Sequence, residues 1–149
     1  MIVLTLALVA GLLQPPPGAP RPSIPILTTV PAMKTIEKGD QSNMDDARQA
    51  VVKTAAAWKQ LWQQHAPDRP LPAVDFTKEM VVGVFLGSRP TAGYSLEIVN
   101  AIEANGTLVV RYRTAAPPRG AMTAQVITSP YHLVVVSLFA GDVKFEKVQ

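Results

Sequence analysis

The chain has 149 residues, of which 48% are hydrophobic and 17% charged, and this size and composition suit one domain with a substantial core. It contains no cysteine, which excludes disulfide bonds, a thiolate nucleophile and cysteine metal ligands. The net charge of +3 comes from scattered basic residues that do not alternate with aromatic residues, so nucleic-acid binding is not expected.

The first 25 residues are expected to lie outside the globular domain. Residues 1–13 (MIVLTLALVAGLL) are too short an apolar run to span a bilayer and are typical of the apolar region of a secretory signal. A retained anchor and an N-terminal core strand are the alternative interpretations. Residues 14–25 are half proline and predict an extended linker. This layout predicts an exported protein with a single domain at residues 26–149.

The first part of the domain is predicted to hold three strands and a helix. Residues 24–30, 33–38 and 48–53 are expected to form strands, with a polar turn at 40–46. A helix is predicted at residues 55–65 (AAAWKQLWQQH), with Thr54 as N-cap and Pro67 beyond its end. One face of this helix gathers Trp58, Leu61, Trp62 and His65, which favours packing on a sheet over ligand binding.

The most informative stretch is residues 75–94 (DFTKEMVVGVFLGSRPTAGY). Residues 80–86 have no polar position, so both faces of this strand must be covered by protein. The chain then leaves the core at Gly87 and re-enters a strand at Tyr94. The intervening loop is tight, mostly uncharged and presented by a rigid strand, which suits binding better than catalysis.

A hairpin follows, with Asn105-Gly106 as its turn signal. A three-residue loop at 104–106 would place apolar residues opposite each other, whereas a two-residue turn would place Ile98 opposite Arg113. We therefore expect a bulge at Gly106, with Arg111 and Arg113 pointing outward. The expected pairs are Ile98 with Tyr112, Ile102 with Leu108, and Asn100 with Val110. Tyr94, Leu96, Ile98 and Ile102 are expected to share one face.

Three more strands are predicted at residues 121–128, 131–139 and 143–148. The predicted fold class is therefore α+β and predominantly β: an antiparallel sheet or sandwich of seven or eight strands, with the Trp-bearing helix 55–65 packed on it.

Three segments resemble the C-terminal domain of the PrcB family: TAAAWKQLWQQH (54–65), VDFTKEMVVGVFLGSRPTAGYSLEI (74–98) and TSPYHLVVV (128–136). The resemblance covers about Lys34 to Val136. It implies an exported, often lipid-anchored, accessory subunit of a secreted protease complex. The family loop usually reads Pro-Thr-Gly-Gly-Tyr, and Ala92 stands here at its first glycine. No lipobox cysteine is present, so lipid anchoring does not carry over.

Neither catalysis nor a metal or other cofactor is predicted. The two histidines are His65, at a helix C-terminus that favours an imidazole, and His132, inside an apolar strand. Asp45 and Asp46 are explained by the turn, and no catalytic or metal-binding motif occurs.

The predicted partner-binding surface comprises two loops: Arg89, Pro90, Thr91, Ala92, Gly93 and Tyr94, with Pro117, Pro118, Arg119 and Gly120. A simple meander places both loops at one end of the sheet. The secondary candidates Ser129, Pro130, Tyr131 and His132 would then begin at the other end. The alternative is that both loops were selected for turn chemistry alone.

The predicted function is a non-catalytic exported module that binds or scaffolds an envelope protein, with a secreted protease as the partner that the resemblance implies. Membrane contact is expected only through an uncleaved N-terminal segment. One alternative is a protease inhibitor acting through residues 89–94, which resemble the Asn-Pro-Thr-Thr-Gly-Phe loop of chagasin-like cysteine-protease inhibitors. The other is a periplasmic structural domain.

Overall fold

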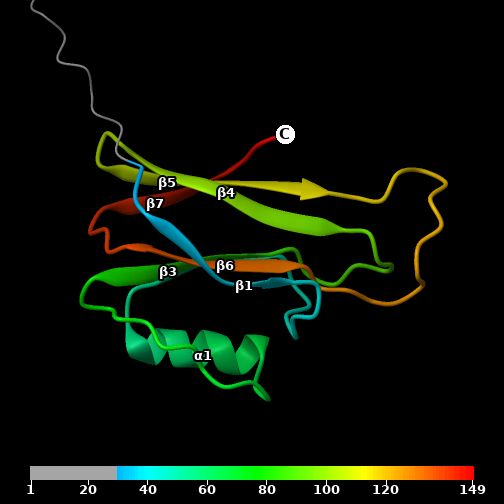
Figure 1. Cartoon of the computed structure of the whole chain (residues 1–149), viewed down its shortest axis with the longest axis horizontal. Coiled ribbons are helices and arrows are strands. Elements are labelled where there is room, and N and C mark those ends of the chain that lie inside the picture. Colours follow the sequence, from blue (N-terminus) through cyan, green and yellow to red (C-terminus); the bar gives the residue numbers. More distant parts are fainter. Residues whose placement is uncertain (1–29) are drawn as a thin grey trace, which may run out of the picture.

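The computed structural model describes residues 30–149, which form two stacked sheets and one helix (Figure 1). The elements are β1 (Met33–Gly39), β2 (Arg48–Val52), α1 (Ala55–His65), β3 (Glu79–Phe85), β4 (Ser95–Ala104), β5 (Thr107–Ala115), β6 (Tyr131–Ser137) and β7 (Asp142–Lys147). The predominantly β fold with one helix is confirmed. The predicted leader, linker and all but the last residue of the strand at 24–30 lie outside the described residues. In residues 30–149, no helix is long and apolar enough to cross a membrane.

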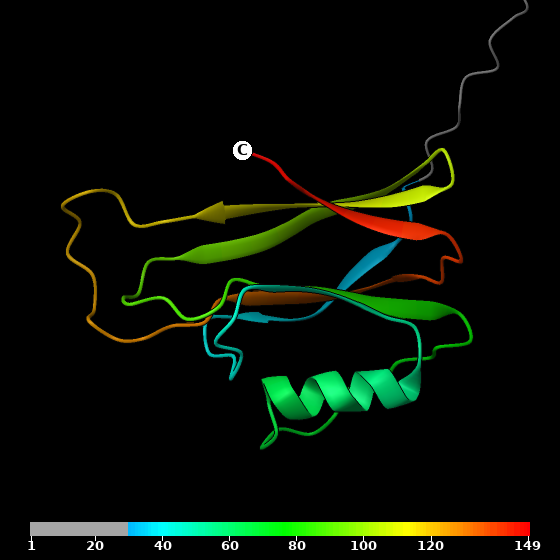
Figure 2. The ribbon, with the colours of Figure 1, turned by 180° about the vertical axis from the view of Figure 1, so that it is seen from behind.

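The strands divide between two sheets. The first has the order β1-β6-β3-β2 and is antiparallel throughout, while the second has the order β4-β5-β7, with β5 and β7 parallel. The chain crosses to the second sheet after β3 and returns after β5 (Figure 2). The simple meander is therefore wrong. The physical reason is that β6 is apolar on both faces, so it lies inside the first sheet beside β3 instead of extending the β4–β5 hairpin.

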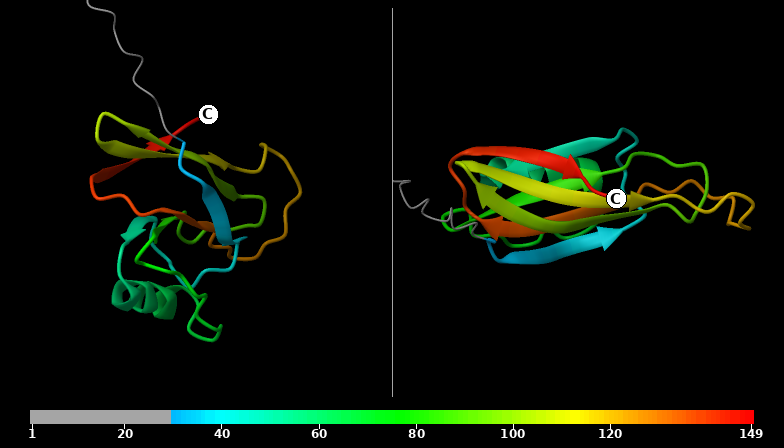
Figure 3. Two further views of the ribbon diagram at one scale, coloured as in Figure 1. Left: turned by 60° about the vertical axis from the view of Figure 1, so that its left-hand side comes forward. Right: turned by 90° about the horizontal axis from the view of Figure 1, so that it is seen from above.

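Strands β3 and β6 occupy the middle layer and supply side chains to two cores. Val81 and Phe85 of β3 face α1, whereas Met80 and Val82 alternate with them and face the second sheet. Both faces of β3 are covered, as its sequence predicted, and the three layers are visible in Figure 3.

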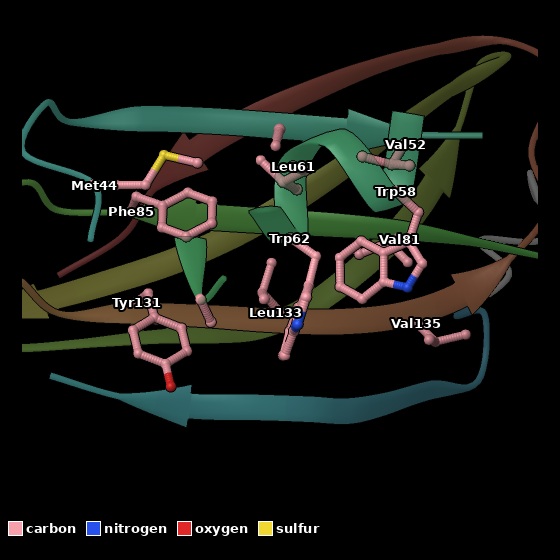
Figure 4. Close-up of a cluster of buried hydrophobic side chains, with 12 residues drawn as sticks. Met44, Val52, Trp58, Leu61, Trp62, Val81, Phe85, Tyr131, Leu133 and Val135 are labelled. Atoms are coloured by element: carbon pink, nitrogen blue, oxygen red, sulfur yellow. The ribbon is translucent and has the colours of Figure 1, made fainter. Parts of the chain in front are cut away.

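The helix closes one of these cores. Its face of Trp58, Leu61, Trp62 and His65 is buried as predicted, and Figure 4 shows the two indoles over the side chains of β3 and β6. The Thr54 side chain accepts the Ala57 N–H and caps the first turn. Trp58 Nε1 donates to the Pro72 carbonyl and Trp62 Nε1 to the Arg69 carbonyl, each at 2.9 Å. Burial of the indoles therefore leaves no indole N–H unpaired.

The prediction of a three-residue loop in the β4–β5 hairpin is wrong. Its turn has two residues, Asn105 and Gly106, whose φ angles of 52° and 74° suit a type I′ turn. The bulge lies at Val99 in mid-strand and not at Gly106. The register pairs Ile98 with Tyr112, as predicted, but Asn100 with Arg111 and Ile102 with Val109. Beyond the bulge Ala101 is the buried residue and Ile102 is half-buried, because one extra residue reverses the faces.

The prediction of a strand at residues 121–128 is also wrong. Residues 116–130 form a long connection between the sheets, in which Thr128 and Ser129 make isolated bridges. A strand requires a paired neighbour along its length, and this segment leaves β5 in one layer to reach β6 in the other. The next strand, predicted to end at residue 139, ends at Ser137.

Removal of the Trp58 indole should destabilise the fold strongly. Trp58 is 2% exposed, so Trp58→Ala leaves a cavity and an unpaired Pro72 carbonyl, and we expect a loss of about 3–5 kcal/mol. The neighbouring Lys59→Ala, on the exposed face, should change stability by less than about 0.5 kcal/mol. Urea denaturation measures both. Equal effects of the two substitutions would mean that α1 does not cover a core.

Candidate functional site

Two loops meet at one end of the sandwich, and we call residues 87–94 and 116–128 the tip (Figure 1, yellow-green and orange segments). Strand directions bring them together, because β3 and β5 end where β4 and β6 begin. At this end Ser95 pairs with Ala115 in one sheet, and Phe85 with Tyr131 in the other. The tip therefore contains both connections that cross between the two sheets at this end.

Backbone hydrogen bonds hold the two loops against each other. Arg89 and Thr128 exchange N–H···O bonds of 2.7 and 3.0 Å, and the Ala92 N–H donates to the Ala124 carbonyl at 3.0 Å. The Thr128 hydroxyl donates to the Thr91 carbonyl at 2.9 Å. The tip is thus braced along its length and does not consist of two independent loops.

Gly93 packs directly against the Pro117 loop. A Cβ atom at Gly93 would lie 2.9 Å from the Pro117 Cβ, and the φ angle of 93° there favours glycine. The predicted pairing of the 89–94 and Pro117 loops is confirmed. Within residues 30–149, Asn105 is the one non-glycine residue with a positive φ angle. The φ angle of Ala92 is therefore not positive. Alanine at the family's first glycine position is therefore compatible with this loop.

The half-buried Arg89 side chain contacts other residues of the fold. Its Nη2 donates to the Leu86 carbonyl at 2.9 Å, and its guanidinium lies 5.7 Å from the centre of the Tyr94 ring. Of the positive charges predicted for the contact surface, Arg119 is the exposed one.

Burial separates the predicted site residues into three groups. Pro90, Gly93, Pro118, Arg119 and Gly120 are exposed, whereas Arg89, Thr91, Ala92, Tyr94 and Pro117 are half-buried. The secondary candidates Ser129, Pro130, Tyr131 and His132 are buried. They begin at the tip end and not at the opposite end, because β6 pairs with β3.

Sequence reasoning missed the apolar side chains of the tip. Met122, Val126 and Ile127 are 102%, 51% and 73% exposed, on the segment that was predicted to be a strand. A half-buried strand alternates apolar and polar residues, but Val126 and Ile127 are adjacent, so the three residues do not follow this alternation. The sequence therefore contained a signal against a half-buried strand here. Exposed apolar side chains grouped on one loop are a feature of interaction surfaces.

A groove of about 390 Å³ borders the tip. It lies between the end of β1 and the start of β4, and is lined by Lys38, Gly39, Asp40, Tyr94, Ser95, Leu96 and Pro130. Tyr94 therefore belongs both to the tip and to the lining of this groove.

His132 connects the two sheets from inside the second core. Its Nδ1 accepts the Ile98 N–H of the edge strand β4 at 2.8 Å, so its Nε2–H donates to the Thr35 hydroxyl at 2.9 Å. The ring is therefore neutral. Burial lowers the pKa of His132 to about 4, and the charge of Lys38 contributes in the same direction. Both ring nitrogens have partners, as expected for a structural histidine.

His65 belongs to a polar cluster beneath the helix end. Its Nδ1 is 2.8 Å from the Ser42 hydroxyl and its Nε2 is 3.3 Å from Glu37, which also pairs with Arg69. A serine, a histidine and a carboxylate are the components of a hydrolytic triad. Here, however, His65 is completely buried, burial lowers the pKa of His65 to about 4, and the Ser42 hydroxyl also accepts the Met44 N–H at 3.1 Å. The cluster thus ties the helix to the preceding turn.

Fold and tip together define a β-sandwich domain that presents one braced loop pair at its end. The PrcB C-terminal family matches residues 80–137, and this confirms the predicted resemblance for that part of the chain. The match includes β3 from Met80 onward, β4, β5, β6 and the whole tip, but not α1 or any residue from 34 to 79. No curated protein and no solved structure gave a match.

Acid should weaken the fold through His132. The folded pKa near 4 lies below the ordinary value of 6.5, so the unfolded chain binds a proton that the folded chain excludes between these pH values. This contribution is complete above pH 6.5 and is lost as the pH falls towards 4, by up to about 3 kcal/mol.

The control variant is His132→Asn, which can still accept the Ile98 N–H but does not titrate. Urea midpoints measured from pH 7 to 4.5 should fall less steeply for this variant than for the wild type. Parallel pH profiles would show that His132 is not the titrating group.

Proposed function

We propose that the chain is a non-catalytic accessory domain that binds another exported protein through the tip. The observation that carries this proposal is the exposure of Met122, Val126 and Ile127 on a loop that backbone bonds hold in place. An ordered apolar surface loses little conformational entropy when a partner covers it, so its burial converts efficiently into affinity.

The family match suggests which class of partner to expect. A PrcB C-terminal match supports association with a protease complex, and the matched residues include the tip. The apolar run at residues 1–13 supports export, and the proposal includes membrane contact only through this segment if it stays uncleaved. A non-catalytic role is supported by the environments of both histidines, which are buried and bonded within the fold.

A capture experiment in cells that make the protein tests this proposal. The tagged wild-type chain should co-purify an exported partner, and two tip variants, Ile127→Asp and Thr91→Arg, should reduce its recovery at least tenfold. The matched control for Ile127→Asp is Leu138→Asp, which also replaces an exposed aliphatic residue by Asp but lies beyond the opposite end of β6. We expect this control to retain the partner.

The absence of a captured partner, or equal capture by tip and control variants, would contradict the proposal and favour a structural domain. Thermal unfolding of each variant verifies that lost capture does not reflect lost folding.

Inhibition of a protease through residues 89–94 is a second candidate. It is favoured by the bracing of that partly exposed loop against residues 124–128 at one end of the sandwich. This candidate predicts that micromolar protein inhibits a papain-like protease and that Thr91→Arg abolishes the inhibition. Full protease activity at that concentration would eliminate this candidate and leave the accessory role intact.

A further inference from the structure

Strand β7 is an edge strand of the second sheet, and the backbone groups on its outer side have no strand partner. The sheet order β4-β5-β7 leaves one side of β7 (red in Figure 3) without a neighbouring strand in residues 30–149. The Val148 N–H donates to the Tyr112 carbonyl of β5 at 2.8 Å, and the backbone groups of successive residues point to opposite sides of a strand. The N–H and C=O groups of Val143, Phe145 and Lys147 therefore point away from β5.

The other three edge strands are less suited to pairing with another chain. β4 has the bulge at Val99, and β1 has a register shift between Thr35 and Glu37. β2 has five residues and carries a single charge, on Arg48. Bulges and short length are features by which edge strands avoid further pairing. β7 has six residues and no register shift along its ladder with β5.

The charges of β7 complement those of a second copy of the same strand. Lys144 and Glu146 are exposed, and they share one face of β7 because side chains two residues apart point the same way. In an antiparallel pair centred on Phe145, Lys144 of each copy lies opposite Glu146 of the other. Arg111 Nε lies 2.7 Å from the Glu146 carboxylate and keeps it on this face. Opposite charges at facing positions stabilise a strand pair.

The two neighbouring registers lack this complementarity. A pair centred on Lys144 places two Lys144 side chains opposite each other, and a pair centred on Glu146 does the same with two carboxylates. Like charges at facing positions destabilise a strand pair. All three registers bring the outward backbone groups together, so the charges decide between them. The register centred on Phe145 also places two half-buried Phe145 rings side by side at the two-fold axis, where each covers exposed surface of the other.

We propose that β7 pairs with β7 of a second copy of this chain, antiparallel and centred on Phe145, and so joins the two β4-β5-β7 sheets into one. This inference goes beyond the proposed function and does not depend on it. The pair has two-fold symmetry, so it closes as a dimer and does not extend into a fibre. Because β7 runs parallel to β5, which ends at the tip, the antiparallel pair places the two tips at opposite ends of the dimer.

Charge reversal tests the proposal with the full chain. Sedimentation equilibrium from about 1 µM to about 1 mM covers the range in which weak complexes dissociate, and the wild type should form dimers within it. Lys144→Glu and Glu146→Lys each place like charges at both facing pairs, so each should raise the dimer dissociation constant by about tenfold or more. An equimolar mixture of these two variants again has opposite charges at both pairs and should recover the dimer. Both positions are exposed, so each variant should keep the wild-type melting temperature.

Two control variants should dimerise like the wild type. Lys34→Glu makes the same charge change at an exposed position of another edge strand, β1. Ile127→Asp tests the alternative that two copies associate through the apolar side chains of the tip. A wild type that stays monomeric up to about 1 mM would overturn the proposal. Unchanged dimerisation of Lys144→Glu, a mixture that recovers no dimer, or a dimer lost only in Ile127→Asp would overturn it as well.

Discussion

The whole architecture depends on two strands that have no polar face. In β3 and β6, successive side chains enter opposite cores, so both strands must lie between two covering layers. Each fully buried Val, Leu or Phe side chain on these strands contributes about 1.5–3 kcal/mol of transfer free energy. Helix α1 covers one face and the β4-β5-β7 sheet covers the other. The edge strands β1 and β2 carry the exposed positions.

The close packing around β6 encloses the imidazole of His132. His132 can be buried there because its two ring nitrogens meet the Ile98 N–H and the Thr35 hydroxyl. The Ile98 N–H belongs to the edge of the second sheet, next to the bulge at Val99. One neutral side chain thus hydrogen-bonds to both sheets next to the irregularity in the β4 ladder.

Features of the fold that local sequence determines could be predicted, and features that depend on distant partners could not. The helix with its Thr54 cap, the buried strand β3 and the loop at residues 89–94 follow from periodicity and turn chemistry. The bulge at Val99 reverses which side chains of β4 face the core, and the Asn105-Gly106 turn signal gives no indication of this bulge. Residues 121–128 had a strand-like composition but no neighbour to pair with. For the same reason, the exposure of Met122 could not be read from the sequence.

The bonding between the two loops of the tip follows from the division of the strands between two layers. Because β3 and β6 are paired in one sheet and β4 and β5 in the other, the chain must cross between layers twice at the same end. Two crossings side by side can bond to each other, and the Arg89–Thr128 bridge is the result. The family match at residues 80–137 contains both crossings and the four strands that anchor them. The matched part of the chain therefore contains the tip and the strands that flank it, whereas α1 and the remaining strands complete the two cores.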